Sequence, residues 1–265
     1  MLYIRSFVCL LGFFFGIAAH AQTFEIGVMG GGAGYIGDLN QTKPLKISGM
    51  SAGAFAKLNL DAYWAVGLHY TYGKIRANDA VSENEDFRNR NINFKTALNE
   101  VSLQVGFNFL NYFAGGGTKK FTPYIFTGIG GVFYSPKATY NDTEYNLRYY
   151  QTEGQTEAYR HYTMTIPYGV GIKLQLKENW GLFSQIGYRT AYSDYLDDVS
   201  GIYPAANAWP NDGSVALRQQ LSNPSLVPNY GAPGTQRGDF RKRDTYMFVG
   251  IGISYTFVSQ KCYTF

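Results

Sequence analysis

Apolar residues occupy every second position over a long stretch near the middle of the chain. From position 162 to position 176 the even-numbered residues are apolar or aromatic, and most of the odd-numbered ones are small, polar or charged. A period of two predicts a β-strand whose two faces meet different environments. The same alternation recurs near the C-terminus, from Met247 to Phe257. The chain offers no segment of helical period to cover these apolar faces, so we expect them to face lipid.

Strands of about ten residues that alternate in this way are typical of transmembrane β-barrels. The pattern predicts an all-β fold, an eight-stranded antiparallel transmembrane β-barrel of the outer-membrane type. In the strand near 121–134 the lipid-facing side stays open, because Tyr124 and Phe126 compete for it with Ile125 and Ile129. The expected strands cover about 23–34, 49–60, 63–76, 96–109, 121–134, 160–176, 180–194 and 244–258.

The connections between these strands alternate in length. Those near 60, 110–120 and 178 are short or rich in glycine. Outer-membrane barrels have short periplasmic turns and long extracellular loops. With eight strands, both ends of the barrel segment then lie on the periplasmic side. The expected extracellular loops are longer and polar, at about 35–48, 77–95, 135–159 and 195–243.

The first residues predict export. Arg5 precedes an apolar stretch over 7–18, and Ala19-His20-Ala21 offers small residues around a cleavage site. This order is typical of a secretory signal peptide. We therefore expect a signal peptide over 1–21, cleaved near Ala21, and a barrel over 22–258 that resides among the lipids of the outer membrane. A short periplasmic tail over 259–265 follows.

Composition and charge narrow the range of partners. The chain has 23 Tyr and 3 Trp, residue types that favour the headgroup level of a bilayer. Its net charge of +4 is too small to argue for nucleic acid, and no basic stripe is interleaved with stacking aromatic residues. Beyond the expected signal peptide the one cysteine is Cys262. An unpaired thiol is unusual in an oxidising compartment, so we expect either an inert thiol on the tail or a disulfide to a periplasmic partner.

Eight strands leave a narrow interior that side chains fill. The positions that face inward by alternation include charged residues of both signs. Because buried charges need partners, we hypothesise a paired network in the lumen, and a selective conduit is the functional alternative. The members of this network are Glu25, Lys57, Glu100, Lys173 and Arg189.

Candidate chemistry is sparse. His69 and His161 are the histidines outside the expected signal peptide, no Gly-x-Ser-x-Gly elbow is present, and no histidine pair has metal-ligand spacing. We therefore expect no catalytic residue, no cofactor and no metal, and not an enzyme. Asp194, Asp197 and Asp198 could offer oxygen ligands to a hard cation. Their loop lacks the full calcium-loop pattern, so turn caps and solvated carboxylates are the simpler interpretation.

Several segments together carry a resemblance to a known family. They are Gly34-Tyr35-Ile36-Gly37-Asp38-Leu39, Thr122-Pro123-Tyr124-Ile125-Phe126, Ile166-Pro167-Tyr168-Gly169-Val170-Gly171 and Asp194-Tyr195-Leu196-Asp197-Asp198-Val199-Ser200-Gly201. The chain resembles the PorG-type outer-membrane proteins of the Bacteroidetes type IX secretion system, and the last of these segments is the most specific.

This resemblance implies a non-enzymatic barrel that takes part in protein secretion. It also implies association with a periplasmic ring of the PorK and PorN kind, which the barrel would anchor or position. An alternative is a small barrel for adhesion or ligand binding through its extracellular loops. A third candidate is a lipid-modifying enzyme.

Overall fold

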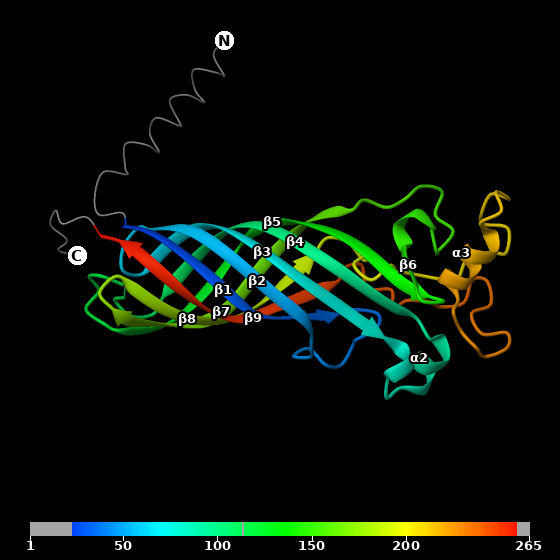
Figure 1. Ribbon diagram of the computed structural model, residues 1–265, viewed down its shortest axis with the longest axis horizontal. Coiled ribbons are helices and arrows are strands. Elements are labelled where there is room, and N and C mark those ends of the chain that lie inside the picture. Colours follow the sequence, from blue (N-terminus) through cyan, green and yellow to red (C-terminus); the bar gives the residue numbers. More distant parts are fainter. Residues whose placement is uncertain (1–22, 113, 259–265) are drawn as a thin grey trace, which may run out of the picture.

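Eight long antiparallel strands close into a barrel (Figure 1). The computed structural model describes residues 23–112 and 114–258. Neighbours around the barrel follow the order β4-β3-β2-β1-β9-β8-β7-β5, and β5 pairs with β4 to close it. The strands are β1 Thr23–Ile36, β2 Ile47–Asn59, β3 Trp64–Asn78, β4 Asn93–Asn108, β5 Phe121–Tyr140, β7 Tyr162–Lys177, β8 Trp180–Ala191 and β9 Thr245–Phe257. The fold class expected from the alternation is confirmed.

Alternation within the strands separates an apolar outer face from a polar interior. On β7, Val170 is 53% exposed, whereas Lys173, an inward-facing residue three positions further along the strand, is buried. The facing of β5, which the sequence left open, is settled by burial. Tyr124 and Phe126 are buried in the lumen, and Ile125 and Ile129 lie on the outer face.

One end of the barrel carries the short turns, together with the start of β1 and the end of β9 (Figure 1). Asp61 shapes the β2–β3 turn, because its Oδ1 accepts hydrogen bonds from the backbone N–H groups of Tyr63 (2.7 Å) and Trp64 (2.6 Å). At the β7–β8 turn Glu178 adopts a φ of 45°. In outer-membrane barrels short turns face the periplasm, and that this end does so here stays a prediction. We call this end the inner end of the barrel and the opposite end the outer end.

The long connections at the outer end contain structure that the sequence pattern did not indicate. A short strand, β6 (Thr143–Asn146), pairs with the end of β5, so that β5 runs to Tyr140 and not to about 134 as expected. β4 likewise begins at Asn93, inside the loop expected over 77–95.

Two short α-helices also lie in these connections, whose sequences show no helical period. They are α2 (Glu85–Arg90) and α3 (Val215–Ser222), and 3-10 turns occupy η1 (Asp79–Val81) and η2 (Leu147–Tyr149). Asn84 caps α2 by accepting a hydrogen bond from the Asp86 N–H. Helices of six and eight residues are too short to show a periodic pattern. Within the described part of the chain, no helix is long and apolar enough to cross a membrane.

Val170 lies on the outer face of β7, where it pairs with Ile125 on one side and Ile186 on the other. We predict that Val170→Arg lowers the free energy of unfolding by about 2–4 kcal/mol, because an arginine near the bilayer midplane has no partner. Tyr162→Arg, at the outer end of the same face, should cost only about 0–1 kcal/mol. Urea unfolding in lipid vesicles measures both. Equal costs for the two variants would show that β7 is placed at the wrong depth.

Candidate functional site

The half of the lumen nearer the short turns is built around Glu25 on β1. Its Oε1 lies 2.9 Å from Lys57 Nζ, and its Oε2 accepts a hydrogen bond from the Asn59 amide at 3.0 Å. Lys173 donates to Asn108 Oδ1 at 2.8 Å and lies over the Tyr124 ring at 4.6 Å. Two lysines thus share this region with one glutamate, and the second lysine is held by an amide oxygen and a π face.

The half of the lumen nearer the long connections is built around Glu100 on β4. Arg189 Nε lies 3.3 Å from Glu100 Oε2, and both side chains are almost completely buried. Tyr246 donates a hydrogen bond to the same carboxylate at 2.6 Å. The Arg189 guanidinium also lies over the Phe248 ring at 4.7 Å. The five hypothesised lumen residues therefore fall into two groups, one around Glu25 and one around Glu100.

Little space is left between these groups. A cavity of about 30 Å³ lies among Phe55, His69 and Phe126, enough for one or two water molecules. His69 stacks on Phe55 with ring centroids 5.2 Å apart. His161 lies at the outer end of β7, where it is exposed and contacts the Phe133 and Tyr162 rings.

The outer mouth of the barrel is covered by residues 194–201, which we call the cap segment. Leu196 and Val199 are fully buried in the main apolar cluster. Thr96 on β4 donates a hydrogen bond to the Leu196 carbonyl at 2.6 Å. The wall of this cluster comes from the inner faces of the strand ends and includes Tyr35, Ile75, Phe94, Leu98 and Phe248.

The carboxylates of the cap segment point into the protein. Asp197 is fully buried, accepts a hydrogen bond from the Tyr35 hydroxyl and takes a second from the Val199 N–H at 2.9 Å. Asp198 is also fully buried and accepts from the hydroxyls of Thr152 (2.5 Å) and Tyr159 (2.6 Å). The expectation of solvated carboxylates is therefore wrong for Asp197 and Asp198. These two carboxylates are buried because the loop that carries them folds back over the outer mouth, which a local sequence pattern does not reveal.

Asp194 belongs to a different group from the one that the sequence suggested. Carboxylate oxygens of Asp38, Asp194 and Asp244 lie within 4.8 Å of one another. Hard cations prefer oxygen ligands, so these three residues are the ones in the described chain that could hold such an ion. Asp38 and Asp244 follow and precede strands far apart in sequence, and no local motif marks them.

Burial and neighbouring negative charge raise the pKa values of these carboxyl groups. Burial, together with the Asp197 carboxylate, raises the pKa of Asp38 to about 9. Burial raises the pKa of Asp197 to about 7, with Asp194 adding to the effect. The pKa of Asp244 is raised well above its usual range by burial and by the charges of Asp197 and Asp38. At neutral pH the group therefore retains protons that solvated carboxyl groups would lose.

Two buried arginines tie the cap segment to the other outer connections. Arg237 donates to Glu153 Oε1 at 2.9 Å and to the Asp198 carbonyl at 2.6 Å. The same Glu153 oxygen accepts the N–H groups of Ser200 and Gly201. Sequence reasoning missed these residues because their partners are brought together only by the fold.

The second arginine, Arg90, is held by both oxygens of Asp79 at 2.6 and 3.1 Å. It also donates to the backbone carbonyls of Asp38 (3.0 Å) and Arg237 (2.8 Å). Arg90 and Arg237 together link all four long connections. The outer mouth is thus closed by one interlocked layer, and not by independent loops.

The inner mouth is also covered. The β4–β5 connection folds back so that Tyr112 and Ala114 are buried. Asn108 donates hydrogen bonds to the carbonyls of Ala62 (3.0 Å) and Tyr112 (3.2 Å). The barrel is therefore filled in its middle and covered at both ends. Cys262 lies outside the described residues.

Comparison with known proteins places the chain in a family. A family model described as "Domain of unknown function (DUF6089)" matches residues 4–211. The chain belongs to this family. The matched region includes the cap segment. No curated protein matches the chain.

Several solved structures of bacterial β-barrels are similar to this member of the DUF6089 family. The N-terminal β-barrel domain of OprF from Pseudomonas aeruginosa is 14% identical, with 89% of this chain and 97% of that chain covered and a TM-score of 0.38. Neisserial surface protein A is 9% identical, with 90% and 100% covered and a TM-score of 0.43. The outer membrane protein OprG from Pseudomonas aeruginosa is 10% identical, with 90% and 98% covered and a TM-score of 0.39.

The raised pKa values of the cap carboxyl groups predict a pH dependence. A free Asp loses its proton near pH 4, whereas Asp197 in the closed cap keeps its proton up to about pH 7. The closed state therefore binds more protons than the open state in this interval, and closing becomes less favourable as pH rises, by up to about 1.4 kcal/mol per pH unit for each such group. Hydrogen exchange of the Leu196 and Val199 amides, corrected for its intrinsic pH dependence and measured with EDTA, reports this opening.

Asp197→Asn should make the opening free energy less dependent on pH while keeping an acceptor for the Val199 N–H. Asp142→Asn, in the exposed β5–β6 turn, is the matched control and should leave the pH dependence unchanged. Protection of the two amides that grows between pH 4 and pH 7 would contradict the assignment of retained protons.

Proposed function

We propose that this chain is a non-enzymatic outer-membrane component of a secretion machine of the type IX kind, which anchors or positions a periplasmic ring of PorK- and PorN-like proteins. The observation that carries the proposal is the filled and doubly covered lumen. A barrel in which side chains leave about 30 Å³ among Phe55, His69 and Phe126 has no room to pass a protein or a large solute. A partner would then bind to the exposed surfaces of the barrel and not within its lumen.

The resemblance to PorG-type proteins supports the choice of partner. Its most specific part, residues 194–201, forms the cap over the outer mouth. A segment that is buried in the cap is under strong packing constraints, which accounts for a recognisable sequence without any chemistry. The placement of the two histidines, one enclosed beside Phe55 and one on the rim beside aromatic rings, supports a role other than catalysis.

The periplasmic end offers a surface suited to docking. Lys119 and Lys120 are exposed on the β4–β5 connection. That connection is tied to the β2–β3 turn, since the Tyr112 N–H donates to the Ala62 carbonyl at 3.4 Å. A held loop loses little conformational entropy on binding. We propose that this pair of lysines faces the ring.

Gentle solubilisation of native membranes followed by affinity purification tests the proposal. PorK- and PorN-like proteins should co-purify with the wild-type barrel, and Lys119→Glu/Lys120→Glu should reduce their yield several-fold by reversing the charge of the docking loop. Arg160→Glu/Lys242→Glu reverses two exposed charges at the opposite end and should leave the yield unchanged. Absence of ring proteins from the wild-type eluate would overturn the proposed function.

We further propose that Cys262 forms a disulfide with a periplasmic partner. A lone thiol in an oxidising compartment readily finds another. Non-reducing gels of membranes treated with a rapid thiol trap should show a heavier species, lost with reductant and with Cys262→Ser. A single monomeric band under trapping would remove the covalent link and leave non-covalent docking to be judged by co-purification.

Adhesion or ligand binding through the extracellular loops is the second candidate. Exposed apolar side chains in the β8–β9 connection favour it, since Leu226 is 90% exposed and Phe240 58% exposed. If the purified barrel lacks ring proteins but binds host or bacterial surface material through this connection, the second candidate replaces the first.

A further inference from the structure

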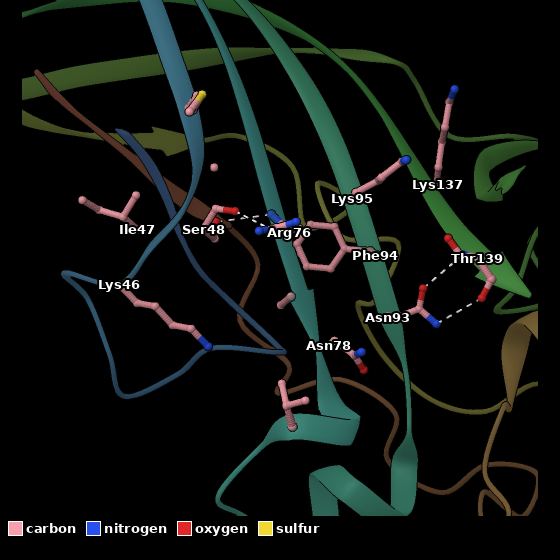
Figure 2. A pocket seen from close by; sticks show the side chains of 14 residues that line it. Lys46, Ile47, Ser48, Arg76, Asn78, Asn93, Phe94, Lys95, Lys137 and Thr139 are labelled. Carbon is pink, nitrogen blue, oxygen red and sulfur yellow. Dashed lines mark hydrogen bonds between the residues drawn. The ribbon is translucent and has the colours of Figure 1, made fainter. Parts of the chain in front are cut away.

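A row of positive charge crosses three neighbouring strands on the outer wall of the barrel. Arg76 on β3 pairs directly with Lys95 on β4, and Lys95 pairs directly with Lys137 on β5. All three side chains are exposed and lie on the outer face (Figure 2). Side chains at directly opposed positions have Cβ atoms about 4.5–5.5 Å apart, and like charges there are destabilising. Such a row requires an explanation.

The protein supplies little negative charge to this row. Glu144 on β6 forms an ion pair with Lys95 and lies 4.0 Å from Lys137. Two further cations, Lys46 and Lys74, border the same surface. Within residues 23–112 and 114–258, neither of these lysines nor Arg76 has a carboxylate within 4.0 Å. Among the residues that line this surface, five are basic and one, Glu144, is acidic, an excess of four positive charges. Glu83, which lies near Lys46, is already paired with Lys43.

The surface beneath these cations is a groove with an apolar floor. Its volume is about 1020 Å³, and small residues such as Gly49, Ala52 and Ala97 form its base. Met50 projects beside them and is 83% exposed. An adjoining hollow of about 590 Å³ extends the groove past Ile47 towards Lys46. The groove therefore offers an apolar lower part and a cationic upper rim.

The height of the groove matches the boundary of a membrane. Tyr72 on β3 and Phe133 on β5 lie on the same outer face, four residues below Arg76 and Lys137. Girdles of aromatic residues mark the two membrane interfaces of outer-membrane barrels. Four residues span about 13 Å along a strand, or roughly 10 Å along the membrane normal for the usual tilt. Long basic side chains can bend back across part of this distance to reach headgroups.

We propose that this groove binds an anionic, phosphate-bearing lipid of the outer leaflet. The occupant follows from charge complementarity and from the continuity of the groove with the lipid-facing wall. The phosphates would lie among Lys74, Arg76, Lys95 and Lys137, and the adjoining part of the headgroup would lie along Met50 and Ala52, the second of which is opposite Tyr72. The acyl chains would continue along the lipid-facing wall below Tyr72. The lipid would supply the negative charge that the row of opposed cations lacks. This site is independent of the proposed secretion role, because it lies on the outer half of the wall.

A binding titration tests the proposal. Increasing amounts of fluorescent diphosphoryl lipid A are added to nanodiscs of phosphatidylcholine that contain the barrel, and binding to the barrel is measured. Lys74→Ala/Arg76→Ala removes two cations without breaking an ion pair. It should weaken binding by roughly 30-fold, as expected for two basic residues near an anionic surface. Arg160→Ala/Lys242→Ala, two exposed basic residues outside the groove, is the matched control and should bind as the wild type does.

A second variant keeps the test independent of any folding defect. Glu144→Gln removes the one carboxylate near Lys95 and Lys137 and should tighten binding several-fold, a gain that misfolding would not produce. Equal weakening by the groove and control variants would overturn the proposal in favour of general charge attraction. Displacement of the lipid by inorganic phosphate at equal concentration would overturn it in favour of a free-phosphate site. Unchanged affinity in both groove variants would also overturn it.

Discussion

The pairing of β1 with β9 is the constraint on which the rest of the structure depends. It runs from Phe24 opposite Phe257 to Ile36 opposite Thr245 and joins the two ends of the described chain. Inside a bilayer no water is available to backbone groups, so an open sheet edge costs several kcal/mol for each unpaired group. The seam removes both edges at once. With the seam in place, the pleat of each strand has one side towards lipid and one side towards the lumen, and residue types follow from that division.

Closure with eight strands makes the interior narrow, and a narrow interior makes each buried charge costly. The barrel meets this cost with partners of several kinds. Glu100 receives both Arg189 and the Tyr246 hydroxyl, and Arg189 also lies against the Phe248 ring. Removing one partner from such a buried pair costs about 3–5 kcal/mol, because the other charge is left uncompensated. The lumen charges are therefore part of the packing, and they occupy the space that a conduit would need.

The strands and their facing could be predicted from the sequence, because a period of two is a local property. The facing of β5 stayed open for a local reason. Both of its faces carry apolar side chains, since Tyr124 and Phe126 alternate with Ile125, so parity alone could not say which face meets the lipid. The hypothesised lumen residues followed from the same parity, although their partners, such as Asn108 for Lys173, did not.

The outer layer could not be predicted, because it is assembled from four connections that are distant in sequence. Nothing near Asp38 indicates Asp244, and nothing near Arg90 indicates the Arg237 carbonyl that it contacts. The resemblance in residues 194–201 marked one part of this layer without revealing that it is buried. The apolar members of that segment, Leu196 and Val199, are the local signal that sequence reasoning passed over.

The cap and the outer wall are mechanically coupled through the pleat. On β3, Ile75 packs into the cap cluster, whereas Lys74 and Arg76 on either side of it face outward. On β4, Phe94 packs into the same cluster, and its neighbour Lys95 faces outward. Strand ends that project beyond a membrane tend to fray unless they are tied down. The buried cap ties these ends down from inside, which holds the row of cations at a fixed spacing on the outside. A row of side chains held at a fixed spacing loses less conformational entropy on binding than a mobile one. The packing that closes the outer mouth therefore also prepares the basic groove for its ligand.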